Sequence, residues 1–184
     1  MKVDNIDILS QFTNDFCEIV EKHCKYVVVS GFLAISSGRS RGTEDIDIIV
    51  SHLSLKEFEE LHKDLLKKFS LLHLDELLVE DVYDYLKDSN IRYVYKGTII
   101  PNMEFKFAKT LIDKDNLEKR KKINLTDLDI YFAPIECAIV FKEKYLGSEK
   151  DLEDARHLRN VYLEEIDEKE IDRYSFLIDK MLED

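Results

Sequence analysis

The stretch from Val27 to Val50, VVVSGFLAISSGRSRGTEDIDIIV, decides the fold. A hydrophobic run leads through a glycine-marked turn and a polar loop with two arginines to a second hydrophobic run that carries Asp45 and Asp47. Because Ile46 alone separates the two aspartates, a strand places both carboxylates on the same face. Paired carboxylates on a largely buried strand are costly without a compensating positive charge. The pattern therefore predicts a divalent metal ion, since hard cations prefer carboxylate oxygens.

Length and composition fit one compact unit. The chain has 184 residues, of which 45% are hydrophobic, so it can bury a sizeable core. Its net charge of −12 argues against broad nucleic-acid binding, which depends on a large cationic surface. A local basic groove stays compatible with this charge.

The cysteines and the N-terminal sequence favour the cytoplasm. The chain has three cysteines and no CxxC pair, and the helical patterns around Cys17 and Cys137 predict buried thiols. Such an odd set fits a reducing compartment. The first residues show no signal-peptide pattern, and no apolar run is long enough to span a membrane, so no membrane partner is expected.

Hydrophobic periodicity predicts the elements in order. We expect a helix over about residues 4–24, a strand over 26–30, a short helix over 32–35 and a strand over 44–50. A helix follows over about 54–68, where Ser54 and Glu57 form a capping-box pattern. Residues 71–90 are ambiguous apart from a short helix near residue 85. Strands over 91–96 and 98–107 flank Gly97 and predict a hairpin, with Pro101 disturbing the first half of the second strand.

The remaining chain is predicted to be mostly helical. A charged helix over 111–122 and a strand over 128–132 precede helices over 135–146, 149–163 and 167–182. This order predicts an α+β fold, a small mixed β-sheet core flanked by helices with a helical C-terminal part. We expect the core to span residues 1–132 and the helical extension to span residues 133–184, packed together as a single compact unit.

The order of Gly31, Arg41, Thr43, Asp45 and Asp47 resembles the signature of the polymerase-beta-like nucleotidyltransferase superfamily. The run from Arg41 to Asp47 is more closely similar to the AbiEii-like branch, which includes minimal nucleotidyltransferases and toxins of toxin–antitoxin systems. The later stretch APIECAIVFKEKYLGSEKDLEDARHL resembles that branch as well. The resemblance covers roughly residues 26–158. In one departure, Ser30 stands where the family usually has the first glycine of the turn.

The resemblance implies a transferase that uses a metal ion, Mg²⁺ or Mn²⁺. It would move a nucleoside monophosphate from a nucleoside triphosphate (NTP) to a hydroxyl acceptor, with pyrophosphate leaving. Asp45 and Asp47 would be catalytic and would hold the metal ions. A third carboxylate comes from a neighbouring strand in the family, and Glu104 is our choice for this metal ligand. It would also help to deprotonate the acceptor hydroxyl.

The resemblance also implies a set of nucleotide-binding residues. The backbone amides after Ser30 and Gly31 would cradle the triphosphate. Arg41 would bind phosphate charge, and Thr43 would fix the loop or contact phosphate. Lys142 would reach the phosphates or the acceptor from the C-terminal part.

Several of these residues have plainer explanations that the sequence leaves open. An isolated Asp-Ile-Asp is common at solvated strand ends, and Glu104 on a half-exposed strand can equally be a surface acid. Lys150, Asp151 and Asp154 belong either to the family segment or to an exposed helix start with N-terminal acids.

The function hypotheses belong to different classes. The main hypothesis is the nucleotidyltransferase, with a protein side chain, a small molecule or an RNA end as the acceptor. The first two are slightly favoured, because the acidic surface would repel a large RNA. The alternative is a catalytically weak nucleotide-binding or toxin–antitoxin partner module with the same fold, since fold does not fix function. The altered turn at Ser30 favours the alternative. A homodimer formed through the C-terminal helices, or an antitoxin partner, is a further possibility.

Overall fold

The structure is a computed structural model that describes residues 5–74 and 76–183, with side chains described from residue 8 onward. Asp4, where the first helix was predicted to begin, lies outside these residues. Within the described ranges, no helix is both long and apolar enough to cross a membrane. The predicted burial of Cys17 and Cys137 is confirmed, and both are free thiols.

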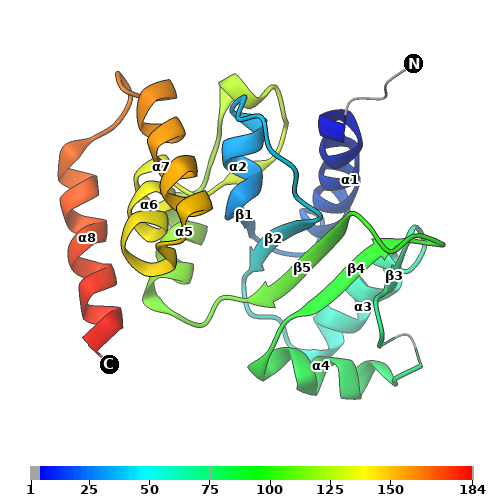
Figure 1. Ribbon diagram of the computed structural model, residues 1–184. Coiled ribbons are helices and arrows are strands. Elements are labelled where there is room, and N and C mark those ends of the chain that lie inside the picture. The colour runs from blue at the N-terminus through cyan, green and yellow to red at the C-terminus, as the bar shows by residue number, and fades with distance from the viewer. Residues whose placement is uncertain (1–4, 75, 184) are drawn as a thin grey trace.

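One mixed sheet forms the centre of the fold, with the strand order β3-β4-β5-β2-β1-β7-β6 (Figure 1). The Asp45 strand, β2, lies between β1, to which it is antiparallel, and β5, to which it is parallel. The predicted hairpin is confirmed, because β4 and β5 are antiparallel neighbours. The strand bounds are β1 Tyr26–Val29, β2 Asp45–Val50, β3 Phe69–Leu71, β4 Ile91–Tyr95, β5 Asn102–Phe107, β6 Lys121–Lys122 and β7 Tyr131–Phe132.

Helices cover both faces of the sheet and form a group at one end of the molecule. Figure 1 shows α6, α7 and α8 side by side, with α7 next to α2. The last turns of the predicted 135–146 helix are a π-helix, η2 (Phe141–Leu146). The helix bounds are α1 Asn5–Val20, α2 Gly31–Ser36, α3 Leu55–Leu65, α4 Val79–Asp88, α5 Leu111–Lys119, α6 Ile135–Val140, α7 Glu149–Val161 and α8 Glu168–Glu183, with a 3₁₀ turn, η1, at Asn124–Thr126.

The predicted α+β fold class is confirmed, and most element bounds agree to within a few residues. The capping box of Ser54 and Glu57 is present at the start of α3. The second hairpin strand begins only at Asn102, since Pro101 has no N–H group to donate to a ladder. The short strands β3 and β6 were not predicted. The division into residues 1–132 and 133–184 stays a prediction.

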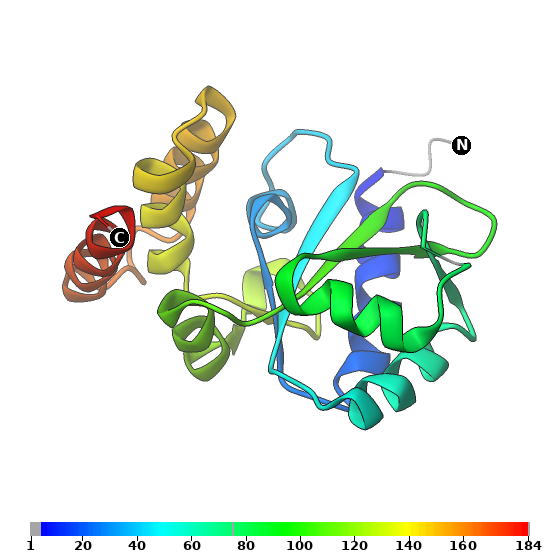
Figure 2. The ribbon, with the colours of Figure 1, turned by 90° about the horizontal axis from the view of Figure 1, so that it is seen from below.

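Successive side chains of each strand point to opposite faces of the sheet. Ile46 and Ile48 of β2, and Phe105 of β5, join the main core that packs against α1, α2, α3 and α4. Ile49 faces the other way and meets Leu117 of α5. Figure 2 shows α5 on one side of β1 and β2, with α1 and α3 on the other. Asp45 and Asp47, four and two residues before Ile49, therefore share its face.

Candidate active site

Three carboxylates meet on this less covered face of the sheet. The parallel register of β2 and β5 pairs Asp47 with Glu104 and Asp45 with Asn102. Directly paired positions on neighbouring strands carry their side chains on the same face. The sheet therefore brings the three predicted catalytic residues to adjacent positions.

Asp47 lies in the most unfavourable electrostatic environment of the three. Burial raises the pKa of Asp47, and the charges of Glu104 and Asp45 raise it further. A hydrogen bond with the Ser30 hydroxyl and the charge of Lys106 act in the opposite direction, without cancelling the increase. The site thus holds excess negative charge that a cation would relieve.

The other two carboxylates are held by neutral and basic neighbours. Asn102 Nδ2 donates to Asp45 Oδ1 at 2.6 Å. Glu104 accepts a hydrogen bond from Arg92 Nη2 at 2.9 Å and another from Asn90. In this conformation, therefore, Arg92 supplies the positive charge next to Glu104.

The donor atoms suit a hard cation in kind, because all three candidates are carboxylates. No group of three or more His, Cys, Asp or Glu side chains within residues 8–74 and 76–183 is already arranged around a metal position. The metal-ligand roles of Asp45, Asp47 and Glu104 stay predictions.

The turn between β1 and α2 has an unusual backbone. Ser30 has φ of 68° and ψ of −142°, a region that glycine occupies far more readily than other residues. Ser30 thus adopts the conformation for which glycine is suited, and it keeps a hydroxyl next to Asp47. The helix that follows, α2, has only six residues, so its terminus by itself offers a weak anion site.

Gly31 makes room for a guanidinium group. A Cβ atom built on Gly31 would lie 1.9 Å from Arg41 Nη2. The side chain of Arg41 therefore packs directly on the backbone of the turn, and only glycine leaves space for it. This contact brings two predicted nucleotide-binding residues together.

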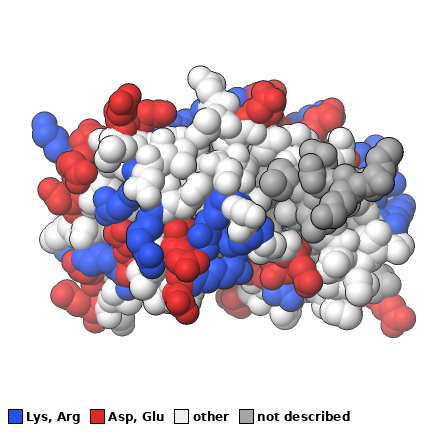
Figure 3. Space-filling view, turned by 45° about the horizontal axis from the view of Figure 1, so that its top comes forward, with Lys and Arg blue, Asp and Glu red and all other residues white. Residues whose placement is uncertain are grey.

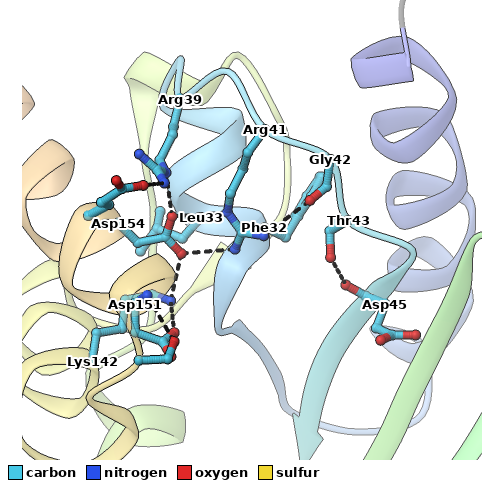
Figure 4. Close-up of polar contacts among 12 residues, drawn as sticks. Phe32, Leu33, Arg39, Arg41, Gly42, Thr43, Asp45, Lys142, Asp151 and Asp154 are labelled. Carbon is cyan, nitrogen blue, oxygen red and sulfur yellow. Dashed lines mark hydrogen bonds and ion pairs between the residues drawn. The ribbon is translucent and has the colours of Figure 1, made fainter.

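Arg41 and Lys142 converge on one buried acid, Asp154 of α7 (Figure 4). Arg41 donates to the two Asp154 oxygens from Nε at 2.9 Å and from Nη2 at 2.8 Å. Lys142 Nζ donates to Asp154 Oδ2 at 2.8 Å and to Asp151 at 3.2 Å. Arg39 Nε lies 2.6 Å from Asp154 Oδ1, and Arg39 Nη2 lies 2.6 Å from Glu153.

We call this group of three basic and three acidic side chains the Asp154 cluster; it comprises Arg39, Arg41, Lys142, Asp151, Glu153 and Asp154. The side chain of Asp154 is 0% exposed, so the interpretation as an exposed helix start is wrong for this residue. Burial alone would raise the pKa of Asp154, but hydrogen bonds from Lys142 and Arg41 hold it below its ordinary value. Asp154 is therefore a buried anion that orders basic groups from both halves of the chain.

Thr43 fixes the loop that leads into β2. Its hydroxyl donates to the backbone carbonyl of Asp45 at 3.0 Å (Figure 4). This is the first of the two roles that the sequence left open for Thr43. The contact sets the start of the Asp45 strand.

Two cavities adjoin the aspartate pair. The first, the sheet–helix cavity, has a volume of about 270 Å³ and includes Ser30, Asp47, Asn116 and Lys142 in its wall. The second, the loop cavity, has a volume of about 890 Å³ and includes Arg41, Thr43, Asp45, Pro101 and Lys150. Asp47 thus faces one cavity and Asp45 the other.

The surface near the loop carries basic groups despite the acidic chain. Figure 3 turns the top of Figure 1 toward the viewer, and Lys and Arg side chains gather near the middle of this face between acidic ones. Local positive charge is therefore available in a protein whose net charge is −12.

The site contains residues that the sequence did not single out. Asn102 and Glu104 are separated by one residue on β5, so alternation alone would have placed Asn102 on the face of Glu104, and the register puts it beside Asp45. Asn90, Arg92 and Asn116 carry no comparable signal, because their roles depend on how β4 and α5 pack.

Comparison with solved structures identifies the fold. The structure of the antibiotic-resistance factor ANT(2'')-Ia superposes with a TM-score of 0.57 and 10% identity, over 99% of this chain and 95% of the other. The lincomycin-bound lincosamide antibiotic adenylyltransferase LnuA gives a TM-score of 0.52 and 15% identity, over 88% of this chain and 98% of the other. An antigenic nucleotidyltransferase-like protein from Paracoccidioides brasiliensis gives a TM-score of 0.55 and 14% identity, over 97% of this chain and 89% of the other.

Sequence comparisons add no closer relationship. No protein-family model matches the chain, and no curated protein matches it. At these identities the structural likeness concerns the fold alone. The chain therefore has the fold of the nucleotidyltransferases to which it is similar, over nearly its whole length.

Proposed function

We propose that the protein is a metal-dependent nucleotidyltransferase that moves a nucleoside monophosphate from an NTP to a hydroxyl acceptor. The observation that carries the proposal is the position of the aspartate pair between two cavities, with Asp47 in the wall of one and Asp45 in the wall of the other. In-line transfer needs the nucleotide and the acceptor on opposite sides of the reacting phosphorus. Separate cavities at Asp47 and at Asp45 would suit this arrangement.

The step is a substitution at the α-phosphorus. The acceptor oxygen forms a bond to the α-phosphorus while the bond from that phosphorus to the oxygen bridging to the β-phosphate breaks. Pyrophosphate leaves, and the proton of the acceptor hydroxyl passes to a nearby carboxylate, for which Glu104 beside Asp47 is our candidate. To act in this way Glu104 exchanges its contact with Arg92 for the acceptor.

Asp45, Asp47 and Glu104 would hold Mg²⁺ or Mn²⁺, because all three are carboxylates at adjacent positions of two paired strands. When bound, such ions stabilise charge on the attacking and leaving oxygens. The raised pKa of Asp47 supports this assignment, since a buried carboxylate with acidic neighbours gains most from a cation.

The phosphate groups would lie by the Ser30–Gly31 turn. Arg41 packs on Gly31, and Lys142 lines the cavity that also contains Ser30 and Asp47. Two ordered cations beside this turn supply the charge that a triphosphate requires. Both now contact Asp154, which keeps them in place before the nucleotide binds.

The acceptor would enter the loop cavity, which mixes apolar residues such as Leu9 and Pro101 with Arg41 and Lys150. A protein side chain or a small molecule suits it better than a long RNA, since the chain has a net charge of −12. LnuA is an adenylyltransferase of a lincosamide antibiotic, so antibiotics belong among the acceptors tested. The proposal also includes membership of the AbiEii-like branch, an antitoxin or homodimer partner, and a location in the cytoplasm.

The test is transfer of label from each α-³²P NTP with Mg²⁺, to the protein itself, a cell lysate, total RNA and a panel of antibiotics. The matched control is the double variant Asp45→Ala/Asp47→Ala. Label on an acceptor with the native chain, and none with the variant, is the expected result. Equal labelling by both proteins would refute the assignment of the two aspartates.

A catalytically weak nucleotide-binding module is the second candidate. It is favoured by the strained Ser30 and by the contacts of Glu104, Arg41 and Lys142, all of which already have protein partners. Tight NTP binding with no transfer to any acceptor would select this candidate. Substitution of Asp45 and Asp47 would then affect metal-dependent binding alone.

A further inference from the structure

The walls of the sheet–helix cavity suit a flat aromatic group. Phe141 and Tyr145 of η2 both line it, and their rings stack with centroids 4.6 Å apart and planes inclined by 28°. The π-helical turn directs four residues, Phe141, Lys142, Tyr145 and Leu146, to the same cavity. Aromatic walls accept any nucleobase by stacking. This part of the cavity therefore provides affinity without selectivity.

One polar atom in the wall lacks a partner. Asn116 of α5 is 5% exposed and lines the cavity, and its Oδ1 is buried without a hydrogen bond. A buried carbonyl without a donor is unfavourable, so a ligand that brings an N–H group is favoured there.

The neighbouring polar groups are already engaged. Asp113 Oδ2 accepts from the backbone N–H groups of Lys109 and Thr110 at 3.1 and 3.0 Å. Lys142 is held by Asp151 and Asp154. Among the described residues that line this cavity, Asn116 contributes the buried side-chain oxygen that lacks a donor.

We propose that the sheet–helix cavity binds the nucleobase of the NTP and that Asn116 Oδ1 accepts a hydrogen bond from an exocyclic amino group. The preferred nucleotides are then those whose base carries an exocyclic amino group, which are ATP, CTP and GTP. Uracil and hypoxanthine have no exocyclic amino group, and the carbonyl oxygens in its place are repelled by the acceptor Asn116 Oδ1. The inference rests on the proposed function, because the phosphates must lie near Ser30 and Asp47 for the base to reach this cavity.

The test compares two nucleotides that differ by one amino group. Dissociation constants are measured by calorimetry for ATP and for purine riboside 5′-triphosphate, which lacks the 6-amino group. We expect the native chain to bind ATP about tenfold more tightly. In Asn116→Ala the two constants become equal, because ATP loses affinity while the analogue does not.

Matched variants distinguish a loss of base selectivity from a general loss of nucleotide binding. Asn116→Leu, which keeps the number of side-chain heavy atoms and the branch at Cγ but removes the polar atoms, is expected to lose the ATP preference as Asn116→Ala does. Tyr145→Ala weakens both nucleotides to a similar degree, since stacking does not depend on the amino group. Asn124→Ala, on the exposed turn η1, leaves both constants unchanged.

The outcomes distinguish this inference from the proposed function. A tenfold preference that persists in Asn116→Ala and Asn116→Leu overturns the role of Asn116 and leaves the transferase standing. A preference of the native chain for UTP or for the analogue also overturns it. Failure of every triphosphate to bind the native chain overturns both.

Discussion

At the scale of single residues, Asp154 is the acid that three basic side chains of the candidate site share. Its side chain is fully buried and contacts Arg39, Arg41 and Lys142. Asp154→Asn leaves these cations without their shared anion, so we expect the free energy of unfolding to fall by about 3 kcal/mol. The loss should be largest near neutral pH. Because its pKa is lowered in the fold, Asp154 stabilises the protein above its ordinary pKa, and this contribution is lost as the pH falls.

The same variant tests positioning as well as stability. The native chain should bind a nucleoside triphosphate more tightly than the nucleoside. Asp154→Asn should reduce this ratio of affinities about tenfold, while the affinity for the nucleoside stays the same. Glu153→Gln is the matched control, since Glu153 contacts Arg39 and its side chain is 45% exposed. If both variants lower stability and triphosphate binding equally, Asp154 has no special role.

Asp47 should show the opposite relation between charge and stability. Its pKa is raised in the fold, so folding favours the protonated form and the ionised group costs stability as the pH rises through that pKa. Asp47→Asn should therefore stabilise the protein by about 1 kcal/mol at pH 7 and abolish transfer. Thermal unfolding at several pH values measures this. A stabilisation that grows at acidic pH would contradict the account, since the native Asp47 is then uncharged.

Ser30 combines backbone strain with a useful hydroxyl. Ser30→Gly relieves the positive φ of 68° and should stabilise the fold by about 1 kcal/mol, while the missing hydroxyl raises the pKa of Asp47 further. The acid limb of the pH–rate profile should then move to higher pH. Ser36→Gly, inside α2, is the control and should destabilise the fold. An unchanged profile in Ser30→Gly would refute the link between Ser30 and Asp47.

At the scale of elements, the turn from β1 into α2 is shaped to receive Arg41. In Gly31→Ala the new methyl group meets the end of a flexible side chain, so the fold survives while the guanidinium moves. We expect triphosphate affinity to fall about tenfold with little change in stability. Gly42→Ala is the control, because a Cβ there meets nothing within 4 Å. Equal effects of the two substitutions would argue against the packing of Arg41 on Gly31.

Elements with strong local signals were predictable from the sequence. The two hydrophobic runs around Gly31, the capping box at Ser54 and the hairpin at Gly97 each depend on residues close in the chain. The three-residue β3 and the two-residue β6 do not, since strands this short exist only through their partners. The π-helical end of the 135–146 helix contacts α7 and α8, which come later in the chain, and no local pattern predicted it.

Some parts of the candidate site were likewise predictable from local sequence, and others depend on tertiary contacts. Alternation along β2 predicted that Asp45 and Asp47 share a face, and alternation along β5 placed Glu104 on the polar side of its strand. The register of the two strands brings all three to one face. The Asp154 cluster joins Arg41 to a residue more than a hundred positions later, through contact of α7 with α2. No local pattern distinguishes Asp154 from an ordinary acid of a helix start, so only the tertiary structure reveals its burial.

At the scale of the whole molecule, the C-terminal helices complete the site that the sheet begins. The sheet supplies Asp45, Asp47 and Glu104, whereas η2 and α7 supply Lys142 and Asp154. The sheet–helix cavity lies where these parts meet, with Asp47 on one wall and Tyr145 on another. Substrate binding and packing of the helices on the core should therefore be coupled.

The most direct measurement is a crystal structure of the protein with Mn²⁺ and an ATP analogue whose α–β bridging oxygen is replaced by a methylene group. The account predicts an anomalous Mn²⁺ signal between Asp45 and Asp47, phosphates beside Arg41 and Gly31, and the base in the cavity at Asn116. Manganese or the triphosphate bound elsewhere, with Asp45 and Asp47 free of both, would contradict it.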